Sequence, residues 1–270
     1  MNVAIIGIGN MGKALVAGLK KAYGADVRIA GWDKFPEVFP GVGDEVEIID
    51  PWGWNSAGFV PDALILAVKP ADVTGLLDVI SLVSHEHRLD FLVISVAAGV
   101  SISLIRDRVG SGARVCRVMP NTPAMIGEGM SALAFSDNCE PHDVHIVERI
   151  FGACGRVISV PEALMNAATG LSGSGPAFAY SFIEALAEGG VAAGLSYETA
   201  LDMAAQTVIG AARMVLETGD HPSVLRSRVM SPGGTTVKGL EALERGAFKS
   251  TVMAAVADAA ARAADISAGK

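Results

Sequence analysis

The first 160 residues alternate short apolar runs with helical patterns, as a parallel sheet covered by helices does. Residues 63–68 are apolar at every position, which is typical of a strand buried on both faces. The pattern predicts strands at Val3–Ile6, Val27–Trp32, Val46–Ile49, Ala63–Val68, Leu92–Val96, Val115–Met119, Ser131–Phe135 and Val157–Val160. We therefore expect an α/β fold whose first domain, residues 1–160, contains a doubly wound parallel sheet.

After Pro161 the strand pattern ends, and Ala, Leu and Met recur at helical spacing. We expect helices at residues 185–195, 200–216 and 252–266. The change of period predicts a second, all-helical domain over residues 161–270. The charge-free stretch 163–183 has the length of a membrane span, but its central Gly, Pro, Ser and Thr residues argue against a lipid-facing helix.

The composition indicates an assembled protein with a small-molecule ligand. A chain that is 51% hydrophobic and 19% charged suits burial of surface between subunits. A net charge of −8, with no run of Lys and Arg, argues against nucleic acid. The three cysteines match neither a disulfide framework nor a zinc spacing, and no export signal is recognisable. We expect a cytoplasmic homo-oligomer that binds neither nucleic acid nor membrane.

A glycine-rich turn follows the first predicted strand directly and opens the first predicted helix. In its Gly-x-Gly-x-x-Gly pattern, Gly7 permits the tight turn, Gly9 lets a pyrophosphate approach the backbone, and Gly12 lets the helix pack on the strand. The helix start adds free N–H groups and the positive end of its dipole. The predicted dinucleotide site of this Rossmann-type unit is Gly7, Ile8, Gly9, Asn10, Met11 and Gly12. The alternative is a glycine turn that binds no ligand.

Two charged residues close the second predicted strand and bear on the choice of dinucleotide. Asp33 lies about twenty residues beyond the last glycine, where a carboxylate accepts hydrogen bonds from the adenosine ribose and repels a 2′-phosphate. This position favours NADH. Lys34 follows immediately and could hold a 2′-phosphate, so NADPH stays open.

A second cluster of small residues, Ser-Pro-Gly-Gly-Thr-Thr at 231–236, precedes the helical pattern of 237–243. Such a segment leaves backbone N–H groups at the helix start open to an anion. A plain Ser or Thr N-cap is the commoner use of these residues. Two glycines and three hydroxyls within six residues exceed what a cap needs, which favours an anion site.

Five segments together resemble pyrroline-5-carboxylate reductase, the family that makes proline by reducing a cyclic imine. They are Ala67–Pro70, Met119–Pro123, Leu171–Ala177, Val215–Pro222 and Ser231–Thr236, and they run through most of the chain. Residues 35–62 show no such resemblance. We interpret the segment between Lys34 and Pro61, which includes Pro51-Trp52-Gly53-Trp54, as a loop-rich insert whose aromatic residues pack locally.

The resemblance implies hydride transfer from NADH or NADPH to the C=N carbon of 1-pyrroline-5-carboxylate. It places the substrate carboxylate at residues 231–236 and the catalytic Thr236 hydroxyl at the ring nitrogen. The substrate-binding residues implied are Ser231, Gly233, Gly234, Thr235, Thr236 and Asn121. The cofactor contacts implied beyond the glycine turn, Asp33 and Lys34 are Ala67, Val68, Lys69, Pro70, Ala97, Asn121 and Thr122. The resemblance also implies a dimer built through the C-terminal helices.

Other interpretations of the sequence are weaker. His142 and His145 lie one helical turn apart, but no third metal ligand is near, so a solvated helix face is expected. A β-hydroxyacid dehydrogenase would carry a catalytic lysine where this chain has Phe178-Ala179-Tyr180. A non-catalytic nucleotide sensor would keep the glycine turn beside a degraded substrate site, whereas residues 231–236 are complete.

Overall fold

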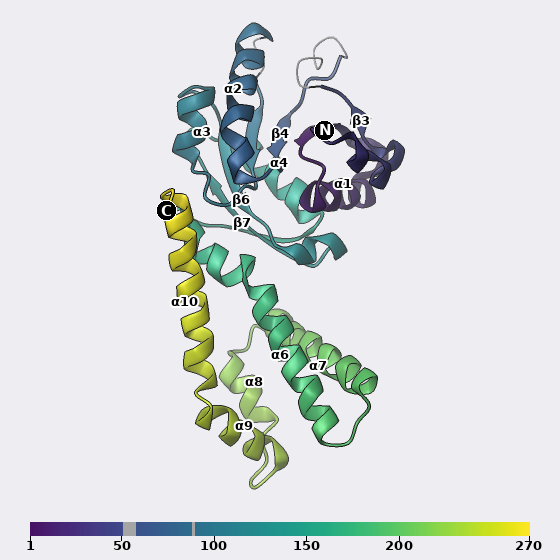
Figure 1. Cartoon of the computed structure of the whole chain (residues 1–270), viewed down its shortest axis with the longest axis vertical. Helices are drawn as coiled ribbons and strands as arrows, with labels where there is room; N and C mark the ends of the chain where they lie inside the picture. The colour runs from purple at the N-terminus through teal and green to yellow at the C-terminus, as the bar shows by residue number, and fades with distance from the viewer. Residues whose placement is uncertain (51–57, 88–89) are drawn as a thin grey trace. The chain divides into compact units, whose positions relative to one another are not determined.

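The computed structural model of the chain describes residues 1–50, 58–87 and 90–270 (Figure 1). The Trp52 and Trp54 of the predicted insert lie outside these residues. The described chain forms two compact units, one of residues 1–174 with 257–270 and one of residues 175–256. The domain boundary predicted near residue 160 stays a prediction.

The first unit is built on an eight-stranded sheet of order β3-β2-β1-β4-β5-β6-β7-β8. Every predicted strand is present, with ends that differ by two residues at most. The strands are β1 (Asn2–Ile6), β2 (Arg28–Trp32), β3 (Glu47–Ile48), β4 (Ala63–Leu66), β5 (Leu92–Ser95), β6 (Val115–Met119), β7 (Gly129–Phe135) and β8 (Gly155–Ser159).

The expected parallel, doubly wound sheet is present, but one strand pair at its far edge is antiparallel. Strand β7 pairs antiparallel with β6, and β8 then runs parallel to β7. Only residues 120–128, with a 3₁₀ turn at Thr122–Ile126, connect β6 to β7. A parallel crossover needs a dozen or more residues, so this connection can only return the chain antiparallel.

Helices cover both faces of the sheet because alternate strand residues point to opposite sides. Val3 and Ile5 pack with residues of α1 (Asn10–Tyr23) and α4 (Pro141–Gly152). Ala4 and Ile6 pack on the other face with α2 (Pro70–His87) and α3 (Ile102–Val109). The end of α10 (Phe248–Ser267) also belongs to this unit, since Ser267 Oγ donates to Asn166 Oδ1 at 3.1 Å.

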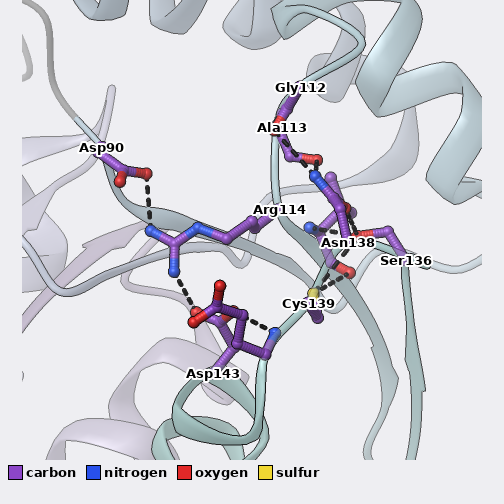
Figure 2. A network of polar contacts seen from close by, with 10 residues as sticks. Asp90, Gly112, Ala113, Arg114, Ser136, Asn138, Cys139 and Asp143 are labelled. Atoms are coloured by element: carbon purple, nitrogen blue, oxygen red, sulfur yellow. Dashed lines mark hydrogen bonds and ion pairs between the residues drawn. The ribbon is translucent and has the colours of Figure 1, made fainter.

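A buried ion pair joins the start of β6 to the start of α4 (Figure 2). The Asp143 side chain is fully buried and contacts Arg114, whose other terminal nitrogen donates to Asp90 Oδ1 at 2.7 Å. Asp143 Oδ2 also accepts a hydrogen bond of 2.8 Å from the Glu140 backbone N–H, which completes a capping box. Burial alone would lower the pKa of Arg114. The hydrogen bond to Asp90 and the charge of Asp143 raise it by more, so the pKa lies above its ordinary value.

The second unit is helical, as predicted, and has a small core. Its helices are α6 (Gly175–Ala192), α7 (Tyr197–Thr218), α8 (Pro222–Arg228), α9 (Thr235–Arg245) and the first part of α10. Helices α6 and α7 pack closely, because a Cβ on Gly190 would lie 2.9 Å from that of Ala200. Ala187, Ala200 and Ala204 are buried there.

Many large apolar side chains of the second unit lie exposed on its helices and on the segments that connect them. They include Leu186, Val191, Leu195, Leu201, Met203, Ile209, Met214, Leu216, Val224, Met230, Leu243, Val252 and Met253. An apolar surface of this extent is typical of an interaction face. Among the described residues, no helix is both long and apolar enough to cross a membrane.

Candidate cofactor and substrate sites

The glycine turn has the geometry that a bound pyrophosphate requires. Gly7 adopts φ +99°, and a Cβ there would lie 2.5 Å from the Ala67 carbonyl oxygen. A Cβ on Gly12 would collide with the Gly7 carbonyl oxygen, so α1 and β1 meet backbone to backbone. A Cβ on Gly9, in contrast, would meet nothing within 4 Å. Gly7 and Gly12 are therefore required by the fold, whereas Gly9 leaves open space at the helix start.

That helix start is free to bind an anion. Gly9 is the N-cap of α1 and provides no side-chain cap, and the first turn contains no acidic residue. The first N–H groups of a helix have no partner within it, and the helix dipole makes this end positive. The residues present thus fit the pyrophosphate of a dinucleotide.

A cavity of about 530 Å³ lies beside this turn, at the carboxyl ends of β1, β2 and β4. It brings together seven of the predicted cofactor residues, namely Gly7, Gly9, Asp33, Lys34, Ala67, Val68 and Lys69. The carboxyl edge of a doubly wound sheet is where such folds bind ligands. Predicted residues that do not line this cavity are Ile8, Asn10, Met11, Gly12, Pro70, Ala97, Asn121 and Thr122.

Sequence reasoning missed the far wall of the cavity. Trp32, Phe35, Val38, Asp72, Gly75, Leu76 and Val79 also line it, mostly from the first turns of α2. The signal was available, because Asp72 lies two residues after the Ala67–Pro70 motif and Leu76 and Val79 follow it at helical spacing. These apolar side chains form a wall against which a flat ring can pack.

Asp33 is held in place by backbone groups from two segments. Its Oδ2 accepts a hydrogen bond of 2.7 Å from the Ile8 N–H, and its Oδ1 accepts one of 2.9 Å from the Phe35 N–H. The carboxylate therefore ties the end of β2 to the glycine turn. Each oxygen keeps a lone pair, which leaves Asp33 able to accept further hydrogen bonds from a ligand.

Lys34 turns toward α2 instead of standing free. Its Nζ lies 2.9 Å from Asp72 Oδ1 and 5.3 Å from the centre of the Phe35 ring. Both side chains of the ion pair are about half exposed. The cation predicted beside the ribose is thus already paired with a carboxylate in this structure.

Asn121, predicted at the nicotinamide end, uses its amide inside the fold. Its Nδ2 donates to the Ser172 carbonyl oxygen at 3.0 Å, and its Oδ1 accepts from the Met130 N–H at 2.9 Å. Ser172 lies in a π-helical turn, Thr169–Gly173, of a kind that is frequent at functional sites. Asn121 therefore fixes this turn beside β7, whichever ligand it also contacts.

In the second unit, residues 231–236 form a helix start without a side-chain cap. Gly234 is the N-cap of α9 and makes no side-chain bond, and its N–H donates to the Ser231 carbonyl oxygen at 2.9 Å. Gly233 adopts φ +69°, which favours glycine. The alternative of a plain Ser or Thr cap is wrong for this helix. The N–H groups of Thr235 and Thr236 lie in the first turn, where no carbonyl of the helix reaches them.

The histidines of α4 and the buried cysteines of the first unit show no features of a functional site in this structure. His142 and His145 are exposed on α4, as expected for a solvated helix face. Cys116 and Cys154 are buried, and burial raises the pKa of the Cys154 thiol to about 11. Neither thiol is therefore a nucleophile at neutral pH.

A glycine turn that opens onto a cavity at the carboxyl edge of a doubly wound sheet defines this chain as a dinucleotide-dependent oxidoreductase. Family models agree: residues 2–99 match "NADP oxidoreductase coenzyme F420-dependent", and residues 162–266 match "Pyrroline-5-carboxylate reductase dimerisation". The chain belongs to the pyrroline-5-carboxylate reductase family, because curated members are similar to it over almost its whole length.

The relatives come from archaea, bacteria, plants and animals. A pyrroline-5-carboxylate reductase of Methanosarcina acetivorans is 41% identical over 98% of this chain and 97% of its own length. The one of Escherichia coli is 35% identical over 94% of each.

Solved structures agree with these relatives. A pyrroline-5-carboxylate reductase of Coxiella burnetii has a TM-score of 0.90 and 34% identity, covering 98% of this chain and 97% of that one. A pyrroline carboxylate reductase of Plasmodium falciparum, solved with NADP bound, has a TM-score of 0.81 and 31% identity, covering 97% of each chain.

Proposed function

We propose that the chain reduces 1-pyrroline-5-carboxylate to L-proline, the last step of proline biosynthesis, with NADH or NADPH as the reductant. The observation that carries the proposal is the pair of uncapped helix starts, at Gly9 and Gly234. A dinucleotide pyrophosphate and a substrate carboxylate are the two anions that this reaction must hold. Family membership supports the same reaction.

The glycine turn and the cavity beside it hold the cofactor. Gly9 admits the pyrophosphate at the start of α1, and Asp33 accepts hydrogen bonds from the adenosine ribose. Ala67, Val68 and Lys69 line the path from there toward the end of β4. Bound in this way, the dinucleotide supplies the hydride. The chain needs mainly to orient two reactants, which is a large part of catalysis by itself.

Residues 231–236 hold the substrate. The free N–H groups at the start of α9 bind the carboxylate, and the Thr236 hydroxyl contacts the ring nitrogen. A protonated nitrogen makes the imine carbon electrophilic, so no strong base is required. Thr236 is partly buried, whereas Thr235 is exposed, which fits Thr236 better to a defined contact.

The chain acts as a homo-oligomer, at least a dimer, through its C-terminal helices. The exposed apolar side chains of the second unit support this proposal, as does the match of residues 162–266 to a dimerisation model. Light scattering tests it, and a monomer at micromolar concentration would contradict it. The predicted cytoplasmic location stays a prediction.

The test of the reaction is oxidation of NADH or NADPH, followed by nicotinamide absorbance, with 1-pyrroline-5-carboxylate present. We expect Thr236→Ala to lower kcat/KM for the imine about 100-fold, in the range that a positioned proton-transfer group contributes. Thr251→Ala, which removes an exposed hydroxyl that donates only to the Ala247 carbonyl oxygen of the adjoining turn, is the matched control and should change it little. Equal kinetics for Thr236→Ala and wild type would remove Thr236 from the mechanism.

A further inference from the structure

Four charged side chains line the cofactor cavity, and two of them neutralise each other. Asp33, Lys34, Lys69 and Asp72 all belong to its wall. Lys34 and Asp72 form an ion pair with Nζ and Oδ1 2.9 Å apart, across 38 residues of sequence. The pair joins the end of β2 to the first turn of α2. The cation next to the predicted ribose position therefore has a fixed partner.

The Asp72 carboxylate of this pair is positioned by the start of a helix. Asp72 lies in the first turn of α2, and its N–H donates to the Lys69 carbonyl oxygen at 2.9 Å. The Phe35 ring lies 5.3 Å from the Lys34 ammonium and stabilises the cation in this position. Lys34 is thus drawn toward α2.

The Asp33 carboxylate, at the end of β2, is held in position by two backbone hydrogen bonds. Asp33 accepts from the Ile8 and Phe35 N–H groups at 2.7 and 2.9 Å, one with each oxygen. Its charge stays at the ribose position. With Lys34 paired to Asp72, that cation no longer offsets Asp33 against the two negative charges of a 2′-phosphate.

We propose that Asp72 is a specificity-determining residue, which disfavours NADPH relative to NADH by pairing with Lys34. The inference rests on the proposed use of this cavity for the dinucleotide. An NADPH molecule must either break the Lys34–Asp72 pair or place its 2′-phosphate beside two carboxylates. NADH carries no such phosphate, so it binds without breaking the ion pair and without this repulsion.

The experiment measures kcat/KM for NADPH and for NADH, with 1-pyrroline-5-carboxylate as acceptor, in wild type and Asp72→Asn. The amide keeps the size of the side chain and removes its charge. A half-exposed ion pair is worth up to about 1 kcal/mol, so we expect the NADPH to NADH ratio to rise roughly fivefold. The change should lie mainly in KM for NADPH, since the substituted residue is remote from hydride transfer.

Two further variants make the test specific. Asp78→Asn removes the same charge from the same helix, where Asp78 pairs with Arg108 at 3.0 Å and does not line the cavity. It should leave the ratio unchanged. In the double variant Lys34→Met with Asp72→Asn no cation is released, so the ratio should fall back to the wild-type value or below.

The inference is overturned if Asp72→Asn leaves the ratio unchanged, or if the double variant keeps the full increase, because Lys34 would then play no part. A merely structural role at the start of α2 would lower the thermal midpoint without changing the ratio, and that result also overturns it. If wild type oxidises neither cofactor with this imine, the proposed reaction fails. Fluorescence titrations with NADPH and NADH then still measure the ratio of Kd values that Asp72 controls.

Discussion

Gly9→Ala should separate cofactor binding from folding. A Cβ at this position meets nothing within 4 Å, and the backbone there is extended with φ −75°, which alanine adopts freely. Loss of a glycine stabilises by about 0.4–1 kcal/mol through the unfolded chain. Alanine is a poorer N-cap than glycine by an amount that does not exceed about 1 kcal/mol. The two effects oppose each other, so the free energy of unfolding should stay within about 1 kcal/mol of wild type.

The same methyl group would occupy the space through which the pyrophosphate reaches the start of α1. A displacement of about 1 Å can cost about 100-fold in rate, so we expect kcat/KM for the cofactor to fall by roughly that factor. Gly12→Ala is the opposite case, because its Cβ would collide with the Gly7 carbonyl oxygen. Backbone cannot yield as a side chain does, and overpacking should destabilise the fold by about 1–3 kcal/mol or more.

Urea unfolding of both variants, combined with fluorescence titration of NADH, provides the assay. The expected pattern is a stable Gly9→Ala protein that binds cofactor poorly, and a destabilised Gly12→Ala protein. Wild-type cofactor affinity in Gly9→Ala would refute the placement of the pyrophosphate. A Gly9→Ala protein that fails to fold would refute the geometry of the turn.

Two further predictions concern stability. Asp143→Asn should lower the free energy of unfolding by about 2 kcal/mol, because it removes a charge-assisted hydrogen bond to Arg114 from a buried position, while Arg114 keeps Asp90 as a partner. Asp137→Asn, which breaks an exposed pair of 2.7 Å with Arg106, should cost less than about 1 kcal/mol. Equal losses in urea unfolding would contradict the distinction. Burial raises the pKa of Cys154 to about 11, so the unfolded thiol ionises first and stability should fall between pH 9 and 11. The contribution of the buried thiol is full below pH 9, and about 2–3 kcal/mol of stability is lost by pH 11. The stability gap between wild type and Cys154→Ala should therefore narrow with rising pH, and a constant gap would count against the buried thiol.

The strands could be predicted from sequence because a sheet covered on both faces leaves continuous apolar runs. The direction of β7 could not, since it depends on the length of the connection and not on the strand itself. The start of α6 was also missed by ten residues, because Gly175 and Pro176 are helix breakers in most positions. Proline is tolerated in the first turn of a helix, where its missing N–H has no partner to lose.

The parts of the candidate sites that depend on local sequence were predictable, and the contacts between distant segments were not. The glycine turn and the small residues at 231–236 carry local patterns, so both helix starts were found. Contacts between distant segments leave no such pattern: Asp72 pairs with Lys34 across 38 residues, and Asn121 binds Ser172 across 51. Asp143 is fully buried beside Arg114, a contact across 29 residues that no local pattern signals.

The last residues of the chain, 257–270, belong to the same compact unit as the first 174. Ile266 lies 3.1 Å from the position of a Cβ on Gly99, in the loop after β5, and Ser267 donates to Asn166. During synthesis on a ribosome, this unit therefore cannot be completed until residues 175–256 have been made and residues 257–270 have followed them. Its N-terminal part must remain competent to accept them, which makes the order of translation a constraint on how this protein folds.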